Sequence, residues 1–174
     1  MKIISRREYL ERADREYASF SHTTKTILES RSLFGQHILG AVGELIRVPP
    51  KYTAAAEVAL GGSVSYIVTD TSRSAGDVIT WLKKNNLGRT TFYPLESMRP
   101  RENNGNERKA CSEKGIHGIA SELFFCDEEY GSLIDSILGK TLIAENLDVA
   151  RTVSAKYNYR LRLVTLDGQL VNPG

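Results

Sequence analysis

Between Gly40 and Tyr93 the chain alternates short apolar runs with stretches in which apolar residues recur every three or four positions. The runs predict strands and the stretches predict helices. In chain order these are a strand over 40–48, a helix over 52–60, a strand over 63–68, a helix over 74–86 and a strand over 90–93. Pro50 suits the first turn of the first helix, and Gly61 stands where a left-handed cap would end it. The pattern is that of a mixed α/β unit.

The same pattern returns 78 positions later, without a gap. Identical residues coincide in the frame G-x3-E-L-x6-Y-x7-L-G, at Gly40 and Gly118, Glu44-Leu45 and Glu122-Leu123, Tyr52 and Tyr130, and Leu60-Gly61 and Leu138-Gly139. The second copy continues with a strand over 141–144, a helix over 147–157 with Asn146 as N-cap, and strands over 160–165 and 169–171. A fixed frame of this length predicts two structurally related halves.

The segments outside the two copies differ from them in composition. Residues 101–115 are polar and contain Gly and Asn, which is typical of a linker or exposed loop. Before the first copy, apolar residues from Tyr9 to Leu28 recur at helical spacing among charges, which predicts an amphipathic helix or the stub of a coiled coil. The predicted organisation is an N-terminal helix or coiled-coil junction (1–36), a first subdomain (37–100), a linker (101–117) and a second subdomain (118–174).

Composition and charge narrow the class of protein. Apolar residues make up 41% and charged residues 25% of the 174 positions, an ordinary globular mix. With no membrane-length apolar run and no apolar leader, we expect a cytoplasmic protein without membrane contact. The net charge of +2 is too small to indicate nucleic-acid binding unless cations cluster locally. Such a cluster exists at Lys83, Lys84, Arg89, Arg99 and Arg101, where a solvated face and DNA contact are equally plausible.

The chain offers little that predicts catalysis. The glycines Gly35 and Gly40 have the spacing of a phosphate loop, but Ala41 and Val42 stand where Lys and Ser or Thr are required. Cys111, His117 and Cys126 match no zinc pattern, and there is no G-x-S-x-G nucleophile motif. We therefore predict no catalytic residues, no metal and no cofactor. A small α/β enzyme with an unrecognised site remains an alternative.

Three segments carry a family resemblance: GAVGELIRVPPKYTAAAEVALGGSVSYIV (40–68), WLKKNNLGRTTFYPLESMRPR (81–101) and YRLRLVTLDGQLVNPG (159–174). Together they closely resemble the hinge domain of bacterial structural-maintenance-of-chromosomes (SMC) proteins. The resemblance implies a hinge fold of two similar subdomains, which joins two antiparallel coiled-coil arms at their tip. It also implies homodimerisation into a ring-like body, weak DNA contact, a nucleoid-associated location and ATPase heads that lie outside this chain.

The resemblance also points to an interface, with departures from the family pattern. Ser65 replaces the usual Gln, Ser19 and Thr23 stand where glycines are common, and the family continues beyond Gly174 with more glycines, so we read the second subdomain as truncated. We predict that the glycine edge of one chain meets the terminal strand of another. The candidate residues are Gly61, Gly62, Val64, Ser65, Leu170, Val171, Asn172, Pro173 and Gly174. A monomeric DNA-binding fragment is the alternative.

Overall fold

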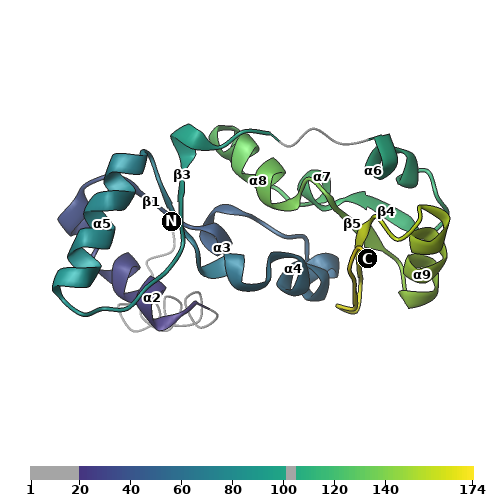
Figure 1. Ribbon diagram of the computed structural model, residues 1–174, viewed down its shortest axis with the longest axis horizontal. Coiled ribbons are helices and arrows are strands. Elements are labelled where there is room, and N and C mark those ends of the chain that lie inside the picture. The colour runs from purple at the N-terminus through teal and green to yellow at the C-terminus, as the bar shows by residue number, and fades with distance from the viewer. Residues whose placement is uncertain (1–19, 101–104) are drawn as a thin grey trace, which may run out of the picture.

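The computed structural model describes residues 20–100 and 105–174, and it contains two small sheets (Figure 1). The first sheet has the order β1-β2-β3, formed by Ile38–Ala41, Ile67–Thr69 and Phe92–Pro94. The second has the order β4-β5-β6-β7, formed by Ile116–Ile119, Thr141–Ala144, Arg162–Thr165 and Leu170–Val171. The predicted mixed α/β class with two sheet-containing halves is confirmed.

The two halves repeat the same connections. In each, the first strand pairs antiparallel with the second, and the second pairs parallel with the third. The first strand of each is irregular at a glycine, Gly40 or Gly118, both with φ 146°. A short helix then follows in each half, α3 (Val42–Leu45) or α7 (Ala120–Leu123). Among the described residues, a fourth strand is found only in the second half, where β7 lies antiparallel on β6.

A second pair of helices also matches between the halves. The 3₁₀ turns η2 (Pro50–Tyr52) and η5 (Glu128–Tyr130) lead into α4 (Thr53–Leu60) and α8 (Gly131–Leu138). Tyr52 and Tyr130 both stand at the N-cap of their helices with nearly the same backbone angles, and both are buried. The predicted correspondence of these tyrosines is therefore confirmed.

Two predicted strands are wrong in part. The run 40–48 is mainly not a strand: β1 ends at Ala41, and α3 begins at Val42 because Glu44 accepts a hydrogen bond from the Ala41 N–H. The run 63–68 is split, since Gly61–Ser65 forms the 3₁₀ turn η3 and only Ile67–Thr69 forms β2. In both cases local hydrogen bonds override the β-branched composition.

The remaining elements follow the predicted order with shifted bounds. The crossover helices are α5 (Ser72–Lys84) and α9 (Leu147–Lys156), capped by the side chains of Thr71 and, as predicted, Asn146. Gly61 ends α4 with a positive φ of 52°, as expected, but its ψ of −135° lies outside the left-handed helical region, and the matching residue after α8, Gly139, has φ −66°. The other elements are α2 (His22–Glu29), η1 (Arg31–Phe34), η4 (Leu95–Ser97) and α6 (Gly105–Ala110).

The flanking segments also depart from expectation. Helix α6 falls inside the predicted linker and buries Glu107 and Ala110, so that segment is not an irregular loop throughout. Helix α2 begins at His22 because the Ser21 hydroxyl accepts a hydrogen bond from the Thr24 N–H. The predicted helical residues before Phe20 lie outside the described residues.

Besides a core of its own beneath each sheet, the two halves share a further hydrophobic core between them. It is built from α3 and α4 of the first half and α7 and α8 of the second, and α4 contacts β6 of the opposite sheet (Figure 1). At the junction, Arg47 and Phe125 form an antiparallel bridge through both backbone N–H groups, 2.7 and 2.8 Å from the carbonyl oxygens. These two residues are themselves 78 positions apart. The halves are thus related across their junction and cannot bury their apolar faces independently.

Candidate functional site

The glycine turn after α4 is exposed and has one unexplained feature. Gly61 needs its φ of 52° to end the helix. Gly62 has no positive φ, and a Cβ built on it would meet only the Tyr66 hydroxyl, at 3.9 Å. Nothing within the described part of the chain therefore requires glycine at position 62. Missing side chains with open space around them permit another backbone to approach.

The other two predicted residues of this edge are held within the chain. Val64 packs against both the shared core and the core of the first sheet. Ser65 accepts a hydrogen bond from the Ser21 N–H at 2.9 Å, and its carbonyl oxygen accepts one from the Thr24 hydroxyl. Because β2 lies between β1 and β3, it has no open edge for a further strand. Any contact here is made through the η3 turn.

The terminal segment ends the second sheet. Leu170 is 40% exposed on β7, whereas Val171 packs against the core beneath β6. Beyond them, Asn172, Pro173 and Gly174 are exposed, and the Gly174 N–H donates to the Tyr159 carbonyl oxygen at 2.8 Å. No strand of the described ranges covers the outer edge of β7. An open edge of this kind can accept a strand from another chain.

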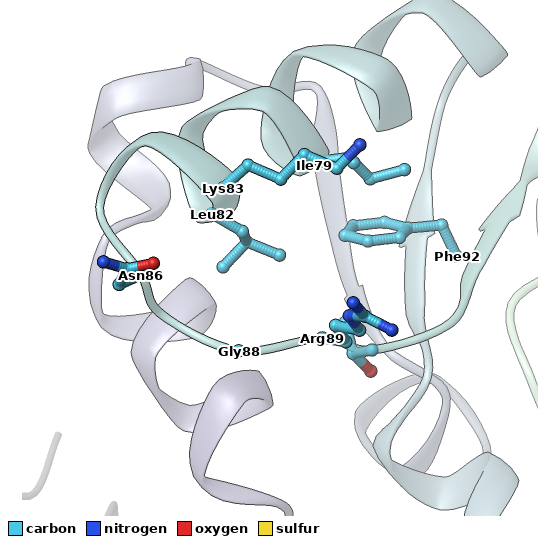
Figure 2. A pocket seen from close by; sticks show the side chains of 8 residues that line it. Ile79, Leu82, Lys83, Asn86, Gly88, Arg89 and Phe92 are labelled. Atoms are coloured by element: carbon cyan, nitrogen blue, oxygen red, sulfur yellow. The ribbon is translucent and has the colours of Figure 1, made fainter.

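Two of the predicted DNA-binding cations meet at one groove. The groove has a volume of about 560 Å³ and lies between the second half of α5, the following loop and β3. Figure 2 shows Lys83 on the helix and Arg89 on the loop, with the apolar side chains of Ile79, Leu82 and Phe92 between them. Both cations are exposed. The result is an apolar floor flanked by positive charge.

The other three predicted cations lie elsewhere. Lys84 follows Lys83 at the end of α5 and is exposed, but it does not line the groove. Arg99 comes after the far end of β3, where its guanidinium donates to the carbonyl oxygens of Glu96 and Met98 at 3.0 and 2.9 Å. Arg101 lies outside the described residues. The four cations that the structure describes do not all line one groove.

Comparison with known proteins identifies the family. The family described as SMC proteins Flexible Hinge Domain matches residues 35–154. Over 168 and 171 residues, the chain is 39% identical to the chromosome partition proteins Smc of Lactiplantibacillus plantarum and Bacillus subtilis, which covers 96% and 98% of the chain. The chain belongs to the SMC hinge family.

A solved structure agrees with this assignment. The hinge has a TM-score of 0.88 to the SMC hinge domain of Geobacillus stearothermophilus, whose crystal structure is described as an asymmetric dimer. The two are 40% identical, and the match covers 97% of this chain and 67% of that one. The chain spans 14% of the length of each of the two curated Smc relatives. The similarity therefore concerns the hinge and not the whole protein.

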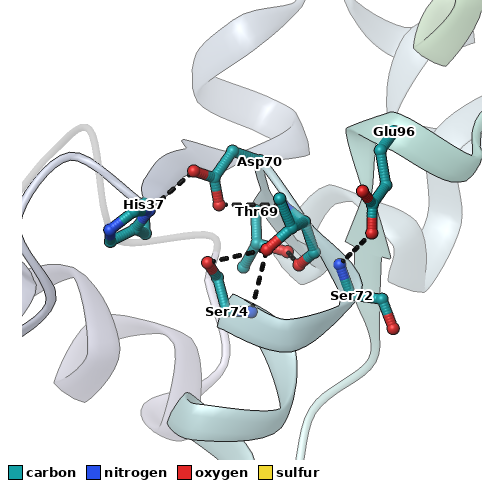
Figure 3. Close-up of polar contacts among 7 residues, drawn as sticks. His37, Thr69, Asp70, Ser72, Ser74 and Glu96 are labelled. Atoms are coloured by element: carbon teal, nitrogen blue, oxygen red, sulfur yellow. Dashed lines mark hydrogen bonds and ion pairs between the residues drawn. The ribbon is translucent and has the colours of Figure 1, made fainter.

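Outside these surfaces, the hinge contains a polar cluster at the start of α5 that sequence reasoning missed. The His37 Nδ1 lies 2.6 Å from the Asp70 Oδ2, and the Ser72 N–H donates to Glu96 at 2.7 Å (Figure 3). The hydrogen bond to His37, followed by that to Ser74, lowers the pKa of Asp70 to about 2. These contacts fix the strand-to-helix turn.

A second polar cluster joins the two halves of the hinge. The Tyr52 hydroxyl lies 3.0 Å from the His117 Nδ1, and the other nitrogen of that ring contacts Glu145. Tyr52 belongs to the first half, and the other two residues belong to the second.

Among the described residues there is no group of His, Cys, Asp and Glu side chains that could hold a metal ion. No helix in that part of the chain is long and apolar enough to cross a membrane.

Proposed function

We propose that this hinge homodimerises and so joins the coiled-coil arms of a chromosome-partition protein, with no catalytic role of its own. The observation that carries the proposal is Gly62, an exposed residue whose missing side chain nothing in the described chain requires. The dimer described for the Geobacillus hinge supports it. In the proposed dimer, the η3 turn of one protomer (Gly61 to Ser65) contacts the terminal segment of the other (Leu170 to Gly174).

Two such contacts related by a two-fold axis would close the pair. Each protomer offers one glycine turn and one terminal edge, so both surfaces are used once and none remains to polymerise. The arms of the parent protein would then leave from the two ends of the chain. As part of such a protein, the hinge would act in the cytoplasm at the nucleoid.

The test is sedimentation of the purified chain over a concentration series. Gly62→Val adds a branched side chain where the chain itself leaves room, so we expect about tenfold weaker self-association with unchanged thermal unfolding. Gly131→Val is the matched control, because a Cβ at Gly131 also meets nothing within 4 Å and the corresponding residue, Thr53, is already β-branched. Equal dimerisation of both variants would place the interface elsewhere. A wild type that stays monomeric would favour the DNA-binding fragment.

We also propose a weak, sequence-independent DNA contact. The observation in its favour is that Lys83 and Arg89, from a helix and a loop, reach the same groove with Lys84 beside them. Arg99 and Arg101 would extend the contact along the chain. Replacing Lys83, Lys84 and Arg89 with Glu should weaken gel-shift binding at low salt and reduce the salt slope by about 1 per cation. Unchanged binding would rule this surface out.

A further inference from the structure

The outer edges of the two sheets differ although the strands before them correspond. In the first half Gly40 pairs with Val68, which pairs with Tyr93 of β3. In the second half Gly118 pairs with Ile143, which pairs with Val164 of β6. Tyr93 therefore corresponds to Val164. In the second half β7 covers this edge, with Val171 opposite Leu163 and Leu170 opposite Val164. In the first half β3 ends the sheet, and no described strand lies beyond it. The second half therefore shows how such an edge can be covered.

The side chains agree with this comparison. The helix N-caps Thr71 and Asn146 correspond, which aligns Ile79 of α5 with Ser154 of α9. Ser154 and Val171 border the same hollow in the second half, where Val171 packs against the core. At the corresponding place in the first half, Ile79 is 37% exposed and lines the open groove of Figure 2. The groove is the position that a residue like Val171 would fill.

The backbone of β3 is also suited to accept a strand. The Ile67 N–H donates to the Thr91 carbonyl oxygen at 3.0 Å, so position 91 faces β2. Since successive residues of a strand point their backbone groups to opposite sides, the N–H and C=O of Phe92 face the open edge. Pro94 lacks an N–H and stands where Thr165 donates to Gln169 in the second half. An added strand would therefore be short and centred on Phe92.

From this edge and groove, we infer that the groove between α5 and β3 binds an extended acidic segment of a partner protein, added antiparallel to β3 with an aliphatic side chain on Ile79, Leu82 and Phe92. The charge of the groove favours an acidic ligand, because Lys83 and Arg89 flank it and none of the described carboxylates lines it. Main-chain hydrogen bonds and a side-chain pocket together are the usual basis of strand addition.

Two other occupants fit either the apolar floor or the flanking cations of the groove less well. DNA would use the cations but would leave the apolar floor, which is unlike a phosphate-binding surface, without a partner. The terminal strand of a second copy has the aliphatic residues, but between Gln169 and Gly174 it carries no side-chain carboxylate for Lys83 and Arg89. An acidic segment with an aliphatic residue would contact both the apolar floor and the two flanking cations.

The probe for this site is a labelled peptide with the sequence of residues 167–173 carrying Q169E and N172E, measured by fluorescence anisotropy against the 174-residue chain. We expect saturable binding, weakened about tenfold by Ile79→Asn in the protein. Leu147→Asn is the matched control, since Leu147 is a similarly exposed (42%) aliphatic residue on the other crossover helix, and it should leave binding unchanged. Methylation of the peptide nitrogen at Val171 should abolish binding, because it removes the donor that faces Phe92.

The charge and the competing occupants are tested in the same assay. The double variant Lys83→Glu with Arg89→Glu should weaken the binding of the acidic peptide more than the binding of the unmodified 167–173 peptide. Equal affinity of wild type and Ile79→Asn for the acidic peptide would overturn the proposal. Unchanged affinity of the peptide methylated at the Val171 nitrogen would also overturn it. The proposal would also be overturned if a single-stranded oligonucleotide displaced the peptide and its binding were lost in Ile79→Asn. Loss of a wild-type dimer in Ile79→Asn would instead assign the groove to a second copy.

Discussion

The two halves of this hinge have the same connections but different outer surfaces. In the second half, β7 covers the third strand of the sheet, and Val171 packs against the core beside the crossover helix. In the first half no described strand covers the corresponding strand β3, and its edge borders an apolar groove with two cations at its rim. The comparison shows that the same strand connections can carry different outer surfaces. Where the first half shows no counterpart of β7, it leaves a surface on which binding can occur.

The largest expected effect concerns the core that the halves share. Leu133 is fully buried in that core, between elements of both halves. Leu133→Ala should lower the free energy of unfolding by about 2–5 kcal/mol, since it removes packing that cannot fully relax. Chemical denaturation should still show one transition for both sheets. Leu147→Ala, at an exposed position, should change stability little, and two separate transitions would contradict a shared core.

The next effect compares the bulge glycines. Gly40 and Gly118 share φ 146°, so alanine is strained at either position, by about 1–3 kcal/mol. A Cβ at Gly40 would also lie 3.0 Å from the Glu44 carboxylate and 3.3 Å from Leu45, whereas at Gly118 the nearest atom is 3.5 Å away. Thermal unfolding should therefore show Gly40→Ala to be the more destabilising substitution. A larger loss with Gly118→Ala would break the equivalence of the two bulges.

A smaller effect concerns the polar cluster of the first half. The pKa of Asp70 is lowered to about 2, below its unfolded value, so its ionised form stabilises the folded state. This contribution is complete above about pH 4 and is lost as the pH falls toward 2. Asp70→Asn should flatten that part of the stability curve, measured by denaturation at several pH values. The change should be modest because the side chain is 36% exposed.

The smallest effect is expected at the ion pair that links the halves on the surface. Arg47 lies 3.1 Å from Asp127, but the two side chains are 62% and 63% exposed. Arg47→Ala should therefore change the free energy of unfolding by less than about 1 kcal/mol. The backbone bridge to Phe125 does not depend on the Arg47 side chain. A large loss in calorimetry would show that the junction relies on charge.

The sequence predicted the order of elements well where pattern and capping agreed. The helix over 147–157 and its cap Asn146 were correct to within one residue, because the cap and the apolar stripe gave the same boundary. The strands predicted over 40–48 and 63–68 were partly wrong, because Glu44 and the η3 turn satisfy the backbone locally. Of the candidate site, clustering in the sequence predicted that Lys83 and Arg89 meet, but it also included Arg99, which lies past the other end of β3.

By itself, the sequence determined that the chain has two related halves, since a gapless repeat of glycines, tyrosines and helix stripes can be read without coordinates. It also determined the family, through segments long enough to be specific. Tertiary structure alone decided that the halves share a core, that β2 is central, and that no described strand covers the edge of β3. These properties depend on which strands pair and which faces meet, and contacts between residues far apart in the chain leave no periodic signal in the sequence.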